Sequence, residues 1–113
     1  MVNGPIETRS WATYALGRIR ELAEHGLIVY ASPSVRRDIE NLEYESDAVS
    51  RCLAALEEGE FRRSLLYSNH RQWLDEYHTT YRGPRGHLDH LYIKLSLNRR
   101  CTRVVVYSFH LER

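Results

Sequence analysis

The periodicity of the apolar residues changes at Gly59, and this change limits the fold more than any other feature of the 113-residue sequence. Before Gly59, apolar residues recur at the three- and four-residue spacing of amphipathic helices, whereas after it they alternate with polar residues, as in half-buried strands. The sequence therefore predicts one α+β domain. We expect N-terminal helices, within residues 1–60, to pack on a C-terminal antiparallel sheet within residues 61–113.

The first predicted helix covers residues 12–23, where alanine, leucine and isoleucine recur at helical spacing. Thr8 or Ser10 is expected to cap its start, and Gly26 can supply the left-handed residue that ends it. A short β-prone run follows at residues 27–30.

Two more helices are predicted before Gly59. The second begins at Ser32-Pro33, because a capping hydroxyl just before a proline is typical of a helix N-terminus. The third carries apolar residues at i, i+3, i+4 and i+7, which are Val49, Cys52, Leu53 and Leu56. We expect Cys52 to pack in the core.

The second half is expected to be a sheet with strands at residues 64–68, 73–80, 91–97 and 104–111 and a flexible break at residues 83–86. The last two strands form a predicted hairpin with its turn at residues 100–102. Its register follows from placing apolar residues opposite one another, which pairs Ile93 with Phe109, Leu95 with Tyr107 and Leu97 with Val105.

The other face of this hairpin collects polar side chains. The same register places Tyr92 opposite His110 and Lys94 opposite Ser108. A register shifted by an odd number of residues would bury Lys94 or expose the leucines. We therefore expect a phenol, an imidazole, an ammonium and a hydroxyl group to lie close together.

Charge is divided unevenly along the chain, although its formal net charge is only +1. Residues 1–60 contain 6 Lys+Arg and 11 Asp+Glu, whereas residues 61–113 contain 10 and 4 and also hold five of the six histidines and five of the eight tyrosines. A basic, aromatic half suits a polyanion such as RNA, since cations neutralise phosphates and aromatic faces stack on unpaired bases. Alternatively, the high arginine content reflects genomic base composition, and the two halves simply attract each other.

The order of these elements, together with five short motifs, resembles the MqsR family of bacterial toxin–antitoxin ribonucleases. The resemblance runs from about Ala12 to the end of the chain and is strongest from Leu56 onward. The motifs are E-F-R-R-S at 60–64, Y-S-N-H at 67–70, W-L-D-E-Y at 73–77, Y-I-K at 92–94 and S-F-H at 108–110.

This resemblance implies a RelE-like fold, metal-independent cleavage of mRNA and neutralisation by a cognate antitoxin. The positions that it implies for the site are Arg63, Leu74, Tyr92 and His110. Two of these residues depart from the family pattern. Leu74 stands where the family has a glutamine and cannot form a hydrogen bond, and His110 places an imidazole where the family has a lysine.

Cleavage of RNA without a metal requires a proton to leave the 2′-hydroxyl, charge on the phosphorane to be stabilised and the departing 5′-oxygen to be protonated. An imidazole such as that of His110 can transfer either proton near neutral pH. Arg63 can bind the phosphoryl oxygens, and Tyr92 can stack on a base or donate a proton. Arg62 and Lys94 are further candidates for substrate binding.

His70 has two open interpretations. It either binds RNA or forms a hydrogen bond to the backbone of the turn in which it is predicted to lie.

We expect no cofactor and no metal. His87, Asp89 and His90 are close in sequence, but residues three apart on a strand point to opposite faces, so zinc binding is not expected. Cys52 and Cys101 are too few for a disulfide framework. No apolar run approaches the length of a membrane span, and residues 1–10 lack the features of a signal peptide, so we expect a cytoplasmic chain.

Two alternatives belong to other functional classes. One is a noncatalytic RNA- or protein-binding module on the same fold, which the leucine at position 74 would permit. The other is a protein-interaction domain whose acidic helices bind a basic partner.

Overall fold

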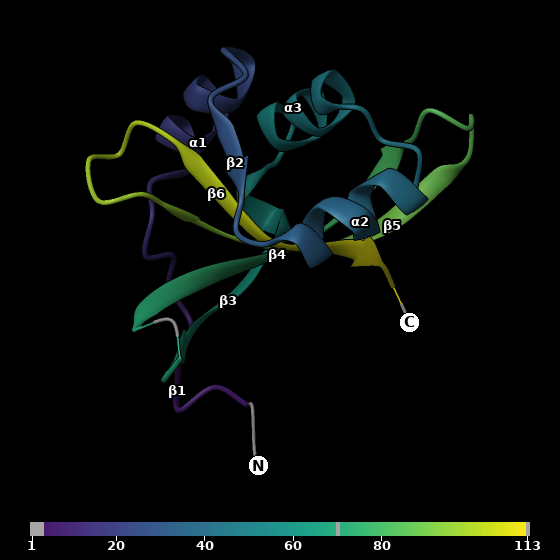
Figure 1. Cartoon of the computed structure of the whole chain (residues 1–113). Coiled ribbons are helices and arrows are strands. Elements are labelled where there is room, and N and C mark those ends of the chain that lie inside the picture. The colour runs from purple at the N-terminus through teal and green to yellow at the C-terminus, as the bar shows by residue number, and fades with distance from the viewer. Residues whose placement is uncertain (1–3, 70, 113) are drawn as a thin grey trace.

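The computed structural model describes residues 4–69 and 71–112, and within them the chain forms helices and strands of an α+β fold, as predicted (Figure 1). The helices are α1 (Leu16–Glu24), α2 (Pro33–Asn41) and α3 (Ser46–Ala54), followed by the short 3-10 helix η1 (Glu58–Glu60). The strands are β1 (Glu7–Arg9), β2 (Ile28–Tyr30), β3 (Phe61–Tyr67), β4 (Gln72–Arg82), β5 (Leu88–Leu97) and β6 (Val104–Leu111).

The strands form one mixed sheet in the order β1-β3-β4-β5-β6-β2. The expectation of helices followed by a purely antiparallel sheet is therefore wrong, because two strands come from the first half of the chain. β2 runs parallel to β6, and the amide of Ala31 donates to the carbonyl of Val106 at 2.9 Å. The pairing with β2 satisfies backbone groups that would otherwise lie unpaired along the edge of β6.

β1 forms the opposite edge of the sheet, antiparallel to β3. Its three residues have no alternating apolar pattern that would reveal a strand. They are held by long-range contacts instead: the amide of Ile6 donates to the carbonyl of Leu66 at 2.8 Å, and the Arg9 guanidinium lies 3.9 Å from the centre of the Trp73 ring. Such pairing depends on the fold and not on local sequence.

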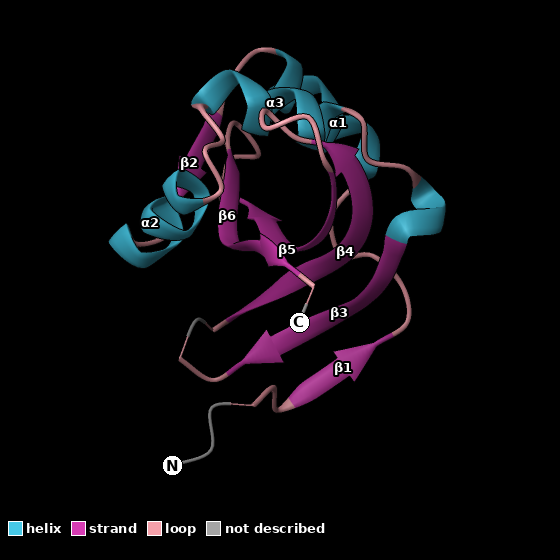
Figure 2. Ribbon diagram, turned by 90° about the vertical axis from the view of Figure 1, so that its right-hand side faces the viewer, coloured by secondary structure: helices cyan, strands magenta, loops and turns pink. Residues whose placement is uncertain are grey.

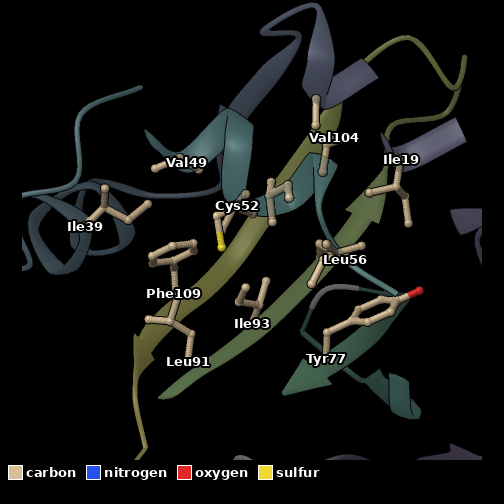
Figure 3. Close-up of a cluster of buried hydrophobic side chains, with 14 of the residues drawn as sticks. Ile19, Ile39, Val49, Cys52, Leu56, Tyr77, Leu91, Ile93, Val104 and Phe109 are labelled. Carbon is tan, nitrogen blue, oxygen red and sulfur yellow. The ribbon is translucent and has the colours of Figure 1, made fainter. Parts of the chain in front are cut away.

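The helices cover one face of the sheet. α1 and α3 lie side by side, and α2 lies near β6 and β2 (Figure 2). Their apolar sides pack against the inward residues of β4, β5 and β6. These residues alternate along β5 as predicted, at Leu91, Ile93, Leu95 and Leu97. Core side chains that are at most 2% exposed include Ile19, Ile39, Val49, Cys52, Leu56, Tyr77, Leu91, Ile93, Val104 and Phe109 (Figure 3).

The start of α1 differs from the prediction. The helix begins after Ala15, which makes no side-chain capping bond, and Thr8 lies in β1. The preceding segment is instead held by the Asp75 carboxylate, which accepts hydrogen bonds from the backbone amides of Thr13 at 3.1 Å and Tyr14 at 2.9 Å. The predicted end is confirmed, because Gly26 has a φ of 69°, in the left-handed region that favours glycine.

The predicted start of α2 is confirmed. The Ser32 hydroxyl accepts a hydrogen bond from the amide of Val35 at 3.4 Å, and Pro33 occupies the first helical position. Because the cap satisfies an amide that the helix leaves unpaired, we expect Ser32→Ala to lower the free energy of unfolding by about 1 kcal/mol in urea denaturation. Ser50→Ala is the control, since Ser50 lies inside α3; equal stability of the two variants would contradict the capping role.

The β5–β6 hairpin has the predicted register at only one end. Ile93 pairs with Phe109, Tyr92 with His110 and Lys94 with Ser108, but Leu95 then pairs with Val106 and Leu97 with Val104. A β-bulge at Tyr107 accounts for the difference. It allows Val106 and Phe109, three residues apart, both to be 0% exposed in the core, so the predicted pairings of Tyr107 and Val105 with leucines are wrong.

The two cysteines have different surroundings. Cys52 lies in the core as predicted, and burial raises the pKa of its thiol to about 12. Cys101 is exposed in the turn between β5 and β6, with a φ of 55°. This turn includes the predicted residues 100–102 and is held by Asn98, whose side-chain oxygen accepts from the amides of Thr102 and Arg103 at 2.8 Å each.

Candidate functional site

Polar side chains form two rows on the sheet face that is turned away from the helices, which we call the polar face. One row crosses β4, β5 and β6 through the paired residues His78, Tyr92 and His110. The second crosses β3 to β6 through Arg63, Glu76, Lys94 and Ser108. The structure thus brings four of the predicted site residues onto one face: Arg63, Tyr92, Lys94 and His110.

Tyr92 is the centre of the first row. Its ring stacks on His78, with ring centres 3.8 Å apart and planes 8° from parallel, and lies 5.9 Å from the His110 ring on the other side. Its hydroxyl donates to the Glu112 carboxylate at 3.3 Å. Partial burial, and then the negative charge of Glu112, raises the pKa of Tyr92, so the phenol keeps its proton and can act as a donor.

The His110 ring is held by its own strand. Its Nδ1 lies 2.9 Å from the carbonyl oxygen of Leu111. A carbonyl oxygen only accepts, so Nδ1 carries the hydrogen, and Nε2 of the neutral ring is left as the proton acceptor. When the ring is protonated, Nε2 also carries a hydrogen and can donate it to a substrate.

Glu76 anchors the second row and is only 4% exposed. One of its carboxylate oxygens lies 3.4 Å from Nε of Arg63, and the other lies 2.7 Å from Nε2 of His78. A buried carboxylate is stable when such partners surround it. Glu76 therefore fixes both an arginine and a histidine on the polar face.

Lys94 continues the second row. Its ammonium donates to the Tyr67 hydroxyl at 2.9 Å and lies 5.3 Å from the centre of that ring. Arg62 lies beside the first row, at the irregularity between Phe61 and Arg63 in β3, and donates to the carbonyl of Gly59 at 3.1 Å. Arg62, His78, Tyr92 and Glu112 line the same pocket, whose volume is about 350 Å³.

Residues 11–111 match the family described as motility quorum-sensing regulator, toxin of MqsA. The chain belongs to the MqsR toxin family. This membership makes it a toxin of a toxin–antitoxin system and implies an antitoxin as its partner. No curated protein matches the sequence.

Leu74, which stands where the resemblance to MqsR toxins implies a glutamine, is 2% exposed. It lies on β4 opposite Leu65, which is 1% exposed. Leu74 is two residues from Glu76 and Leu65 is two residues from Arg63, so both leucines lie on the polar face. An apolar pair thus occupies this position. His70, the other predicted RNA contact, lies outside the described residues.

Two polar residues of the site, Glu76 and His78, were not predicted from sequence. They alternate with the core residue Tyr77, which is 1% exposed, and this period of two places them on the face opposite the helices. Pairing residues 73–80 with residues 91–97 around the break at 83–86 would have placed His78 beside Tyr92. The prediction included the register of β5 with β6 but not that of β4 with β5.

The described residues contain no group of three or more His, Cys, Asp and Glu side chains placed to hold a metal ion. Asp89 is buried and accepts a hydrogen bond from the Tyr44 hydroxyl at 2.8 Å, whereas the His90 ring lies 2.9 Å from the Thr80 hydroxyl. In residues 4–69 and 71–112, no helix is long and apolar enough to cross a membrane.

Proposed function

We propose that this MqsR-family toxin is an endoribonuclease that cleaves single-stranded mRNA through attack of a 2′-hydroxyl on the adjacent phosphorus, without a metal. The observation that carries the proposal is the gathering of Arg63, Tyr92, Lys94 and His110 on one sheet face. Together they offer two cations, a phenol and an imidazole, which can bind a phosphodiester and move its protons. A cognate antitoxin holds this activity in check.

Each side chain has a role that follows from its chemistry. Arg63, which is 56% exposed at its side chain, binds the phosphoryl oxygens and stabilises the charge of the phosphorane. Tyr92 stacks on a base or donates its proton, and His110 protonates the 5′-oxygen as the P–O5′ bond breaks. Arg62 and Lys94 bind flanking phosphates, and His70 is a further predicted contact to RNA. The products are a 2′,3′-cyclic phosphate and a free 5′-hydroxyl.

The test is incubation of the purified chain with single-stranded RNA in EDTA, followed by analysis of the fragment ends. We expect cleavage with 2′,3′-cyclic ends. RNA binding without cleavage would instead favour the noncatalytic binding module, and the absence of both would favour a protein-interaction domain. Mapping the products on a long transcript then identifies the preferred sequence.

RNA affinity should fall steeply with salt, because each phosphate contact releases counterions. For single-stranded RNA, loss of one contact in Arg62→Ala or Arg63→Ala should reduce the slope of log K against log salt by about 0.7. Fluorescence anisotropy with a 2′-O-methyl RNA, which cannot be cleaved, provides the measurement. Arg20→Ala is the control, because Arg20 lies on α1 and donates to the carbonyl of Ala54. An affinity indifferent to salt would count against RNA as the ligand.

Expression of the chain alone in a bacterial host should stop growth and fragment transcripts, and coexpression of its antitoxin should restore both. The reason is that a ribonuclease acting on mRNA removes the templates for protein synthesis. Growth curves and northern blots provide the measurement, with His110→Ala as the control that should not arrest growth. Normal growth with intact transcripts on expression of the wild-type chain would contradict the toxic role.

A further inference from the structure

We propose that His78, held by Glu76, is the general base that takes the proton of the 2′-hydroxyl. The inference rests on the proposed ribonuclease function and adds to it the residue for the first proton transfer. Arg63 and Lys94 are cations, and the phenol of Tyr92 keeps its proton, so none of them is a good base. The polar face needs another group for this step, and His78 lies beside Tyr92 within the first row.

The contact with Glu76 fixes the orientation of His78. The carboxylate oxygen lies 2.7 Å from Nε2 of the imidazole. A carboxylate accepts only, so Nε2 carries the hydrogen and Nδ1 of the neutral ring is left with the free electron pair. Histidine bases are commonly held in one tautomer by a carboxylate in this way, and the carboxylate also stabilises the imidazolium that forms.

Exposure divides the roles within this pair. The side chain of Glu76 is 6% exposed and already contacts Arg63 and His78, so it is poorly placed to reach a substrate. The side chain of His78 is 25% exposed and lines the pocket of about 350 Å³ on this face. The imidazole is therefore the accessible member, and Glu76 is a positioning residue.

The two histidines flank Tyr92, because the paired residues of the first row lie on β4, β5 and β6 in the order His78, Tyr92, His110. In-line displacement at phosphorus requires the attacking and departing oxygens to lie on opposite sides of the phosphate. A base at one end of the row and an acid at the other meet this requirement. The Nδ1 atom of His78 takes the 2′-hydroxyl proton as the 2′-oxygen bonds to phosphorus, and protonated His110 gives a proton to the 5′-oxygen as its bond to phosphorus breaks.

The charges around His78 come from several elements. Glu76 lies on its own strand, Tyr92 stacks on its ring from β5, and Arg63 shares the Glu76 carboxylate from β3. Other titratable or charged groups that line the same pocket are Glu60, Arg62, His90 and Glu112. Among the described residues, the carboxylate that contacts His78 is that of Glu76, so this contact is the one to remove when the role of Glu76 is tested.

The experiment compares two substrates with single cleavage sites: an ordinary RNA oligonucleotide and one with a 5′-bridging sulfur at the scissile bond. A thiolate departs without protonation, so the sulfur substrate needs a base but no acid. We expect His78→Ala and His78→Gln to lose at least tenfold in rate on both substrates. His110→Ala should be slow on the oxygen substrate and recover on the sulfur substrate.

Glu76→Gln tests the positioning role through the pH profile. The amide can still contact His78 but lacks the negative charge that favours the imidazolium, so the acid limb of the rate profile should move to lower pH. An unchanged acid limb would overturn the role of Glu76. For the His78 variants, His87→Ala is the matched control, because His87 is an exposed histidine in the β4–β5 turn.

The outcomes separate the two proposals. If the wild-type chain cleaves neither substrate, the ribonuclease function itself fails. If the wild-type chain cleaves and His78→Gln keeps the wild-type rate on both substrates, the base assignment is wrong while the function stands. Recovery of His78→Gln on the sulfur substrate would make His78 the acid and equally overturn the assignment. Thermal denaturation checks folding, and His78→Gln decides the result if His78→Ala does not fold.

Discussion

The His110→Ala variant is expected to cleave RNA on the order of 10²-fold more slowly than the wild type, because it loses the imidazole that protonates the 5′-oxygen. Folding should change little, since His110 lies near the end of β6, with its ring on the polar face and its Nδ1 bonded to the Leu111 carbonyl. Single-turnover rates across neutral pH, together with the affinity for a 2′-O-methyl RNA, separate loss of chemistry from loss of binding.

His110→Lys gives the sharper comparison, because lysine is the residue that the family resemblance implies at this position. Its ammonium keeps a positive charge across neutral pH. A purely electrostatic role would survive the change with its pH profile intact, whereas a proton-transfer role would shift the pH optimum. Cleavage by His110→Ala at the wild-type rate over the whole pH range would show that another group protonates the leaving oxygen.

The Phe109→Ala variant should lose about 3–5 kcal/mol of the free energy of unfolding, because it leaves a cavity in the core. Phe109 is 0% exposed, packs edge-on against Tyr44 with ring centres 5.2 Å apart and pairs with Ile93 across the hairpin. Urea denaturation followed by tryptophan fluorescence measures the change. Leu111→Ala is the matched control on the same strand, since Leu111 is 37% exposed; a loss below about 1 kcal/mol for Phe109→Ala would contradict its place in the core.

Local patterns predicted the parts of the fold that local chemistry decides. Ser32-Pro33 and Gly26 mark helix ends through a hydroxyl cap and a left-handed residue, and both effects act within a few residues. Thr8 and Ser10 failed as caps because the preceding segment is held by Asp75, more than 60 residues away in sequence. Edge strands β1 and β2 likewise depend on distant partners.

The hairpin shows how a single extra residue limits a register argument. Alternation in β5 correctly assigned the core side of Ile93, but the same alternation in β6 stops at Tyr107. In a regular strand, Val104 and Val106 would lie on the side opposite to Phe109, so all three can be buried only if the period breaks. Nothing in the local sequence favours burial of Val104 and Val106 over Val105.

The candidate site was predicted where one hairpin contains it and missed where it extends beyond that hairpin. Tyr92, Lys94 and His110 belong to the β5–β6 pair, whose register at that end followed from burial. Glu76 and His78 belong to β4. The sequence around Glu76 does not show that its carboxylate contacts both Arg63 and His78, because these contacts form only when the strands of the sheet are in place. Arg63 was predicted through the family resemblance, and its contact with Glu76 emerged only from the structure.

The contrast between the two cysteines gives the chain one chemically addressable position. A thiol attacks electrophiles as its thiolate, so Cys52, buried and with its pKa raised to about 12, is protected from maleimides in the folded state. Cys101 is exposed in the β5–β6 turn, at the end of the hairpin opposite to Tyr92 and His110. A dye attached there would label the folded chain away from the candidate site without any substitution, while labelling of Cys52 would report unfolding of the core.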